Sequence, residues 1–487
     1  MSTETILWHD YETTGRDSRA DRPLQFAAVR TTLDLEEVGE PIALRCELPI
    51  EVLPEPEACL VTGVVPGDFA SEEVSELEFA REIQEAFRQP KTCVAGYNSI
   101  RFDDEFSRFL FWRNLLPIYD REWRNGNSRW DLLDPLRAAY ALRPEGIEWP
   151  MREDGTPSFK LELLTAANGI DHGEAHDAVA DVRATISMAR LLRERIASGK
   201  LYGYLFDSRR KQANRDRIPL GTTEPIVHVS GKIAAKFACA TLVMPLCVHE
   251  EQKNQILCAD LRRDPQVLLD ESAETLRERL FAPRDRSGQN DTSALERPGI
   301  KGVHLNKAPV LAPWSVLDAD ETAWDRMQLD RATVEARAQL VVRHRAALAE
   351  KVQAVHQGRA AGESPDVAAA LYDGFVGDSD QRRAQAFHSR GAAHWPGLEN
   401  EFEDARLREL AFRLRAREAP ESLTEAERVR FDEFVRESLR AVLPDRLARC
   451  EALAADPERK IMEIELLGRL RALLLERGQA LDLSPET

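Results

Sequence analysis

The chain has 487 residues, 43% of them hydrophobic, and a formal net charge of −18. A single hydrophobic core rarely grows beyond about 250 to 300 residues, so this length predicts two to four domains. The longest apolar runs fall well short of the roughly 20 residues that cross a bilayer. We therefore expect no membrane span and no membrane partner.

The start of the chain and its cysteines indicate a compartment. The N-terminal residues include acids and lack the basic segment of a signal peptide, and the seven cysteines form no CxxC pair and no metal-ligand spacing. This pattern is typical of free thiols in a reducing compartment. We expect a cytoplasmic protein.

The net negative charge opposes nonspecific attraction to nucleic acid. The charge is uneven, however, because residues 193–217 carry eight Lys or Arg against three acids. A local basic segment can bind phosphates on an acidic protein. The global charge therefore does not exclude a nucleic-acid enzyme.

Up to residue 198, short apolar stretches alternate with amphipathic ones. The apolar stretches predict strands, and the amphipathic stretches predict helices. The strands are expected at 5–12, 24–34 and 92–98, and the helices at 78–88, 104–116 and 178–197. Because strands that alternate with helices are typical of an α/β fold, we expect an α/β domain at residues 1–198.

The rest of the chain divides into two parts. Between about 225 and 312 the pattern predicts a β-rich domain, barrel-like or sandwich-like, with one helix around 272–281. Beyond about 322 nearly all of the pattern is helical, and Thr424 and Glu427 have the spacing of a capping box. We expect a β-rich domain at 199–350 and a helical domain at 351–487.

Two acids stand inside the first predicted strand. Side chains alternate between the two faces of a strand, so Asp10 and Glu12 point to the same side. Neighbouring carboxylates near a core repel each other and are costly to desolvate unless a cation neutralises them. A solvated strand edge is the plain alternative for this pair alone.

Two later segments add further acids and a histidine. In "GYNSIRFDDEF" Asp103 stands where a strand gives way to a helix, and "AHDAVAD" supplies His176 and Asp181. We expect His176 in the loop that enters a helix, Asp177 at its N-cap and Asp181 one turn inside. Each segment alone is also typical of an ordinary helix start, whose acids favour the helix dipole.

Together these residues predict a metal centre. Carboxylate oxygens are hard ligands that suit Mg²⁺ or Mn²⁺. Two such ions about 4 Å apart stabilise the attacking and leaving oxygens of a phosphodiester displacement, and a nearby His can take a proton from the attacking water. The predicted metal ligands are Asp10, Glu12, Asp103 and Asp181, with His176 as the base.

In this order, as DxE, NxxxFD and HxxxxD, the three segments resemble the signature of the DEDD superfamily of 3′→5′ exonucleases. The His subclass fits, because His176 stands five residues before Asp181 and Asp177 takes the place of the other subclass's tyrosine. The resemblance implies a ribonuclease H-like fold with a mixed β-sheet. It also implies two Mg²⁺ ions, which Mn²⁺ could replace.

Longer segments resemble one family of that superfamily, bacterial exonuclease I. They include "HDYETTG", "DRPLQFAAVRT", "NSRWDLLD" and "GTPSFKLELLTAANGI", and later "PIVHVSG", "VHLNKAPVLAP" and "FRLRAREAP". The resemblance covers nearly the whole chain and implies an SH3-like second domain and a helical third domain that close over the cleft. The implied activity is processive 3′→5′ hydrolysis of single-stranded DNA to 5′-mononucleotides, by a monomer that serves DNA repair and recombination.

Single-stranded DNA is held by phosphate contacts and by bases stacked on aromatic side chains. We predict such contacts from residues of the first domain, namely Arg101, Ser128, Arg129, Phe159 and Lys160. For the aromatic residues, a place in the core is the alternative. The basic segment 209–217 would line the path of the strand or form a solvated linker.

Members of the family dock the acidic C-terminal tail of single-stranded DNA-binding protein. By their match to "ALRPEG" and "YLF", Arg143 and Tyr204 are the predicted partner residues. A surface Arg and a packing Tyr are the alternatives.

Two other functions remain open at this point. One is a 3′→5′ exoribonuclease or proofreading exonuclease, and the other is a non-catalytic scaffold for repair proteins on single-stranded DNA. The 290 residues after position 197 count against a proofreading subunit, which is usually a short chain. A scaffold would have no reason to keep all five catalytic residue types.

Overall fold

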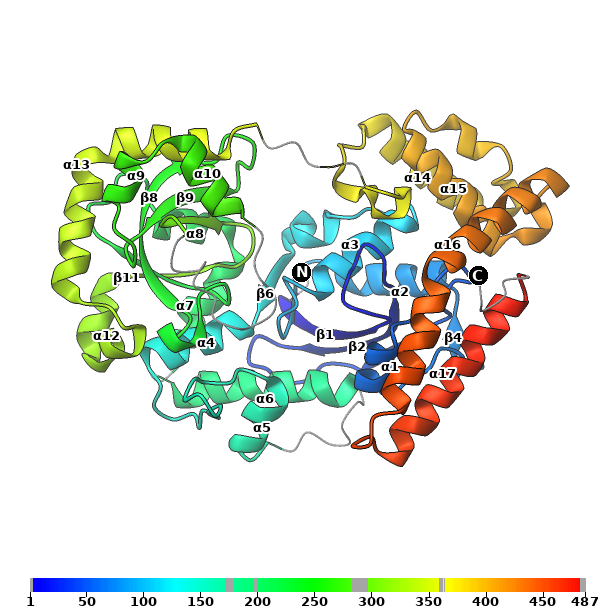
Figure 1. The fold of residues 1–487 in the computed structure, drawn as a ribbon, viewed down its shortest axis with the longest axis horizontal. Helices are drawn as coiled ribbons and strands as arrows, with labels where there is room; N and C mark the ends of the chain where they lie inside the picture. The colour runs from blue at the N-terminus through cyan, green and yellow to red at the C-terminus, as the bar shows by residue number, and fades with distance from the viewer. Residues whose placement is uncertain are drawn as a thin grey trace.

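A computed structural model describes residues 3–170, 178–196, 199–282, 297–358, 362 and 364–481. A central sheet lies between a β-rich lobe, green in Figure 1, and a helical lobe, gold to red. The three parts follow the order predicted from the sequence.

The central sheet has six strands in the order β4-β3-β2-β1-β5-β6. Its inner strand β1 (Thr5–Thr13) is antiparallel to β2 and parallel to β5. The other strands are β2 (Pro23–Thr31), β3 (Ile42–Cys46), β4 (Glu73–Val74), β5 (Thr92–Gly96) and β6 (Ser128–Asp131). Parallel and antiparallel pairs occur together, which confirms the predicted α/β class and mixed sheet.

Alternate residues of β1 enter two separate cores. Ile6 and Trp8 belong to the core that includes α4 and α6, whereas Leu7 and Tyr11 belong to the core that includes α2 and α3. The helices are α2 (Glu76–Arg88), α3 (Asp103–Arg113), α4 (Leu133–Leu142) and α6 (Ala178–Arg195). By the same alternation, Asp10 and Glu12 lie on the α6 face of the sheet.

The β-rich lobe is a five-stranded sheet in the order β10-β9-β8-β7-β11, with antiparallel pairs throughout. Its strands are β7 (Ile226–Val229), β8 (Ala240–Val248), β9 (Gln255–Asp260), β10 (Ile300–His304) and β11 (Val310–Pro313). The predicted helix is α10 (Ala273–Phe281), and α9 (Gln266–Asp270) precedes it. The β-rich character predicted for this region is confirmed.

The helical lobe consists of α14 (Asp378–Arg390), α15 (Ala405–Glu418), α16 (Glu425–Ala454) and α17 (Ile461–Gln479). Thr424 and Glu427 form the predicted capping box at the start of α16. α16 and α17 pack along each other and against α1 (Pro56–Thr62) of the first domain, as Figure 1 shows.

Shorter helices and one long helix connect the three parts. They are α5 (Leu161–Ala167), α7 (Lys200–Phe206), α8 (Lys211–Arg217), α12 (Thr322–Met327), α13 (Arg331–His356) and the 3-10 helix η7 (Val367–Tyr372). The predicted boundary at 350 lies within α13, and the boundaries at 198 and 350 stay predictions. Among the described helices, none is long and apolar enough to cross a membrane.

Candidate metal centre

Asp10 and Glu12 lie at the end of β1, where the strand has lost one of its two neighbours. β1 pairs with β5 only from Thr5 to Trp8, whereas its pairing with β2 continues to Thr13. The two carboxylates therefore stand beyond the end of β5 and are half-buried. A register shift between Glu12 and Thr13 then ends the regular ladder.

Asp181 meets this pair from the helix that covers the same face. It lies in the first turn of α6, next to Val182, which is buried in the core shared with Trp8. One carboxylate oxygen from each of Asp10, Glu12 and Asp181 lies within 4.8 Å of the others. The structure thus brings together three of the four predicted metal ligands.

Asp103, the fourth predicted ligand, reaches β1 from the other side. It is the first residue of α3, and the backbone N–H of Tyr11, between Asp10 and Glu12, donates to its Oδ1 at 3.2 Å. Its exposed fraction is only 1%. It is not one of the three acids grouped within 4.8 Å, but it stands beside the strand that carries two of them.

The carboxylates are held in a state that resists ionisation. Burial, together with repulsion from Asp181, raises the pKa of Asp10 to about 7. Burial and the charges of Asp10 and Asp181 raise the pKa of Glu12 to about 8. Burial and the charge of Asp10 also raise the pKa of Asp103 well above its ordinary value. Crowded hard oxygen donors of this kind fit a divalent cation such as Mg²⁺.

His176 and Asp177 lie outside the described residues. The general base and the N-cap assigned to them therefore stay predictions. The described part of α6 begins at Ala178, directly after these two positions.

Asp104, next to Asp103, fixes the start of α3 through contacts with two arginines. It is fully buried and accepts from Arg121 Nη2 at 2.7 Å and from Arg129 Nη1 at 2.5 Å. Although burial alone would raise it, these guanidinium groups hold the pKa of Asp104 well below its ordinary value. Asp103 and Asp104 thus have opposite environments, since burial and neighbouring acids raise the pKa of Asp103 and neighbouring guanidinium groups lower that of Asp104.

Arg129, a predicted DNA contact, belongs to this buried network. Its guanidinium also contacts Glu122 Oε2 at 2.9 Å and donates to the backbone carbonyl of Asn306 at 2.9 Å. Only 6% of the residue is exposed. The structure therefore gives Arg129 a structural role, and its contact with DNA stays a prediction.

The other predicted DNA contacts are spread over the first domain. Arg101, in the loop between β5 and α3, donates to Asp134 at 3.0 Å and to Ser230 at 3.2 Å. Ser128 begins β6 and is half-buried, opposite Cys93 of β5. The contacts of these two residues with DNA stay predictions.

Phe159 and Lys160 precede α5. Phe159 is buried, with ring centroids 5.8 Å from Tyr140 and 6.1 Å from Trp149. Lys160 is exposed, and its Nζ lies 3.4 Å from Glu162. Phe159 thus lies in the core, and the contacts of Phe159 and of the exposed Lys160 with DNA stay predictions.

The predicted partner residues both bond to the same stretch of the β-rich lobe. Arg143, the C-cap of α4, donates to the backbone carbonyl of Val316 at 3.0 Å. Tyr204 of α7 donates its hydroxyl to the carbonyl of Leu311 at 2.8 Å, and the Arg217 guanidinium lies 3.8 Å from its ring centroid. Both are half-buried at the contact between the first domain and the β-rich lobe.

The basic segment 209–217 forms α8 and the turn before it. Arg209 is buried against Phe206 and pairs with Glu4 at 2.9 Å, so part of this segment serves packing. Lys211 and Arg215 are exposed. The seven cysteines are free thiols, as predicted.

Sequence reasoning missed Asp131 as a positioning residue. Its carboxylate accepts from the backbone N–H groups of Asn98 and Ile100 and, at the start of α4, of Leu133, at 2.9 to 3.1 Å. It therefore fixes the loop that leads from β5 to Asp103. The signal available in the sequence is an acid at the end of a short apolar stretch, "RWD".

Comparison with known proteins identifies the family of the chain. The chain matches the family models Exonuclease over residues 7–189, Exonuclease I SH3-like domain over 209–358 and Exonuclease I C-terminal domain over 365–474. It is 41% identical over 438 residues to exodeoxyribonuclease I of Escherichia coli (strain K12), which is 89% of this chain and 89% of that protein.

Solved structures agree over nearly the full length. The zinc-bound E. coli complex of exonuclease I with single-stranded DNA has a TM-score of 0.90 and 38% identity, over 98% of this chain and 100% of that chain. A structure of SSB and exonuclease I with an inhibitor has a TM-score of 0.88 and 38% identity, over 98% and 100% of the two chains. With its exonuclease, SH3-like and C-terminal domains in this order, the chain belongs to the exonuclease I family.

Proposed function

We propose that this protein is a 3′→5′ exonuclease that degrades single-stranded DNA to 5′-mononucleotides. The observation that carries the proposal is the cluster of Asp10, Glu12 and Asp181, whose oxygens lie within 4.8 Å of one another in a domain of the exonuclease family. The relative solved with single-stranded DNA supports the choice of substrate. We place the activity in DNA repair and recombination in the cytoplasm.

The acids at the end of β1 would hold two Mg²⁺ ions, with Mn²⁺ as a possible substitute. Asp10, Glu12 and Asp181 offer grouped oxygens, and Asp103 approaches through its contact with Tyr11. When bound, such cations supply charge stabilisation for the attacking and leaving oxygens of a phosphodiester. They would also remove the repulsion that raises the pKa values of these acids.

His176 is the proposed general base. The proposal is supported by its position in the sequence, since His176 precedes by two residues the described start of α6 at Ala178, and Asp181 lies in the first turn of that helix. A His near these acids would take the proton of the attacking water, since its ordinary pKa lies near the working pH. Burial of Asp103 beside Tyr11 keeps one carboxylate oriented while substrate enters.

Single-stranded DNA would reach this site past the first domain's basic and polar residues. Lys160 is exposed, and so is Arg101 in the β5–α3 loop, so both can contact phosphates. Ser128, Arg129 and Phe159 are the remaining proposed contacts; two of them are buried and would act through the shape of the site.

A monomer with one protein partner is the proposed assembly. The relative solved with SSB supports docking of the acidic tail of single-stranded DNA-binding protein. Arg143 and Tyr204 would receive it, because both lie half-buried beside the segment from Leu311 to Val316.

The proposal is tested by digestion of 5′-labelled and 3′-labelled single-stranded DNA, with duplex DNA and RNA in parallel. We expect nucleotides from the 3′ end, with Mg²⁺ and not with EDTA. Asp10→Ala should reduce the rate at least 1,000-fold (an order-of-magnitude expectation for loss of a metal ligand) with an unchanged circular dichroism spectrum.

Glu40→Gln is the matched control, since Glu40 is an exposed acid of the same domain. It should leave the rate unchanged. Full activity of Asp10→Ala in Mg²⁺ would refute the site, and faster digestion of RNA would favour the exoribonuclease alternative. No digestion by the wild type would favour a scaffold.

A further inference from the structure

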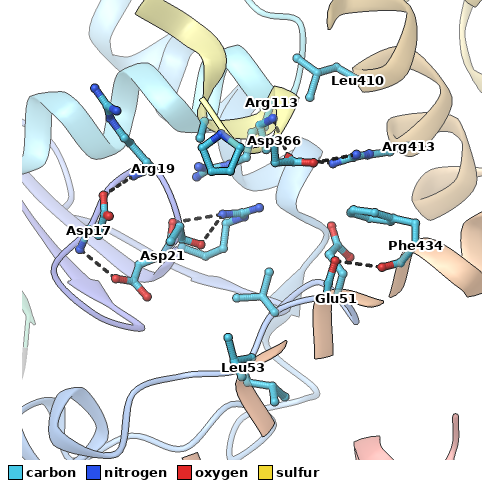
Figure 2. Close-up of a pocket in the computed structure, with 18 of the residues that line it drawn as sticks. Asp17, Arg19, Asp21, Glu51, Leu53, Arg113, Asp366, Leu410, Arg413 and Phe434 are labelled. Carbon is cyan, nitrogen blue, oxygen red and sulfur yellow. Dashed lines mark hydrogen bonds and ion pairs between the residues drawn. The ribbon is translucent and has the colours of Figure 1, made fainter. Parts of the chain in front are cut away.

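A cavity of about 430 Å³ lies between the first domain and the helical lobe, away from the three-carboxylate cluster. Figure 2 shows Asp21 and Leu53 on one side of it and Arg413 and Phe434 on the other. Its walls come from the loop after β1, the loop before α1, η7, α15 and α16. Its size is that of an ordinary small-molecule site.

The wall is both apolar and rich in guanidinium groups. The apolar part includes Leu53, Leu410, Phe434 and Val442. The guanidinium groups are those of Arg19, Arg22, Arg113, Arg413, Arg417 and Arg446. The wall also holds the carboxylates of Asp17, Asp21, Glu51 and Asp366, so its guanidinium groups outnumber its acids by two. A ligand with an apolar or aromatic body and an anionic group would complement this excess of positive charge.

Arg113 is the least compensated of these cations. It is 1% exposed, and its Nη1 donates to the carbonyl of Ser18 at 3.2 Å. Its nearest carboxylate, Glu76, is 3.7 Å from Nε, and Nη2 has no hydrogen-bond partner among the described residues. Burial, and then repulsion from Arg22, lowers the pKa of Arg113 to about 9. A buried donor left in this state is costly unless an acceptor reaches it.

The acids nearby do not complete the compensation, because they are shared. Glu76 also faces Arg22 at 3.2 Å and Arg417 at 3.5 Å, and Arg417 divides its guanidinium between Glu76 and Glu51. Arg417 also lies in the field of Glu418, so Arg22, Arg113 and Arg417 share three carboxylates. Among the described residues, Glu76 is the one carboxylate within 4.0 Å of Arg113. Arg413, by contrast, is already satisfied by a two-point contact with Asp366.

Arg446 already pairs with Glu55 at 3.2 Å through Nη2, but its Nε, like Nη2 of Arg113, is buried without a hydrogen-bond partner among the described residues. We propose that this cavity binds a nucleoside 5′-monophosphate, with its phosphate at the guanidinium groups of Arg113 and Arg446 and its base against Phe434 and Leu410. A phosphate monoester supplies several acceptors to donors that lack them, and arginine matches its geometry. The choice of a nucleotide, rather than another organic phosphate, rests on the proposed function, which releases this class of product.

The cavity is connected to the metal centre through the loop after β1. Thr14, two residues after Glu12, binds the far end of this loop, because its N–H donates to the carbonyl of Arg22 and its hydroxyl donates to Asp21. A nucleotide bound against this loop would shift the end of β1, which carries Glu12. Released nucleotide should therefore inhibit hydrolysis in part without competing with DNA.

The test measures binding to the full-length protein in EDTA, which suppresses nucleotide binding at the metal centre and hydrolysis. The probes are dAMP, deoxyadenosine and inorganic phosphate, followed by calorimetry. Ser438→Phe fills the cavity from a half-buried position of α16 without removing a charge. Ala441→Phe, at an exposed position of the same helix that does not line the cavity, is the matched control.

We expect wild type and Ala441→Phe to bind dAMP with equal affinity and Ser438→Phe to bind it at least tenfold more weakly. Arg446→Gln should also weaken it, whereas Arg440→Gln, an exposed change on the same helix, should not. No dAMP binding by the wild type, or equal loss in both Phe variants, would overturn the site. Deoxyadenosine as tight as dAMP would overturn the phosphate contact, and phosphate as tight as dAMP would overturn the nucleotide. Since no hydrolysis is measured, failure here leaves the proposed exonuclease untouched.

Discussion

At the scale of single residues, the carboxylate cluster lowers the stability of the fold that carries it. Asp10, Glu12 and Asp181 approach within 4.8 Å, and burial strengthens their mutual repulsion. Such strain persists only where the surrounding structure fixes it. Here two acids belong to an inner strand and the third to a helix packed on that strand.

Removal of one charge should stabilise the metal-free protein. We expect Asp181→Asn to raise the melting temperature in EDTA, by roughly 2 to 4 °C for each kcal/mol of repulsion relieved. Addition of Mg²⁺ should raise it further in the wild type and much less in the variant. Thermal scans with and without Mg²⁺ measure both effects, with Glu40→Gln as the control. A lower melting temperature for Asp181→Asn in EDTA would contradict the repulsion.

The raised pKa of Glu12 predicts a pH dependence of stability. Since this pKa moves from 4.5 to about 8 on folding, the folded state keeps a proton that the unfolded state releases. The contribution to stability is therefore full below about pH 4.5 and is lost as pH rises towards 8, with a slope of up to about 1.4 kcal/mol per pH unit.

Glu12→Gln should remove this slope. Urea unfolding in EDTA between pH 5 and 8.5 measures this slope. The free energy of unfolding of the variant should increase relative to that of the wild type as pH rises. Parallel profiles would show that Glu12 ionises freely in the folded protein.

The sequence was sufficient to predict the cluster but not its surroundings. Strand alternation puts Asp10 and Glu12 on one side, and the family signature supplies Asp103 and Asp181. Arg129 was less accessible to prediction, because Asp104 and Glu122, which bury it, lie on other elements. The guanidinium of Arg129, which the sequence suggested for DNA, is paired with these acids.

At the scale of elements, α3 is the component that needs the most support. Its first residue, Asp103, accepts from the backbone N–H of Tyr11 in β1, and its second, Asp104, is paired with Arg121 and Arg129. Phe102 before it provides no side-chain cap. The position of the helix start is therefore set by its ion pairs and by the preceding loop, which Asp131 holds.

Loss of the Asp131 carboxylate should release this loop. Asp131→Ala leaves three backbone N–H groups without their acceptor, which should cost about 2 to 4 kcal/mol of unfolding free energy. Asp131→Asn keeps one acceptor oxygen and should cost less. Urea unfolding measures the loss, with the exposed Asp432→Ala as the control. Equal stability of Asp131→Ala and wild type would show that the loop holds itself.

The longer elements were predictable and the short ones were not. β1, β2 and β5 carry continuous apolar runs and were predicted, together with α2, α3 and α6. β6 has four residues that include Arg129, and β4 has two, which is too short for any periodicity. Such strands are defined by the neighbour they pair with, and that neighbour is distant in sequence.

At the scale of the whole molecule, Glu105 of α3 joins all three domains. Its Oε2 accepts from the hydroxyl of Tyr372 in η7 at 2.5 Å, and its Oε1 lies 3.8 Å from Lys307 Nζ of the β-rich lobe. Arg108, one turn further along α3, contacts the same carboxylate. Both outer lobes therefore contact the helix that begins at the metal centre.

Weakening the contacts of Glu105 with the outer lobes should reduce the number of nucleotides released per binding event. We expect Tyr372→Phe, which loses its hydrogen bond to Glu105, to release fewer nucleotides per binding event on long single-stranded DNA. The rate on a short oligonucleotide should change less than twofold, since the proposed metal ligands are untouched. Single-turnover digestion with a DNA trap measures both. Tyr119→Phe, in the same region, is the control, and equal numbers for the two variants would exclude a role of these contacts.

The last helices complete the surface of the first domain. Leu53, Cys59 and Val65 share one buried core with α16 and α17. Arg477 also donates to the carbonyls of Leu48, Pro49 and Val52, across 425 to 429 positions of sequence. During synthesis this surface of the first domain therefore emerges from the ribosome long before α16 and α17, which bury it. We expect nascent chains to expose it until translation ends, so that a chain cut before residue 461 becomes a client of chaperones and not a smaller nuclease.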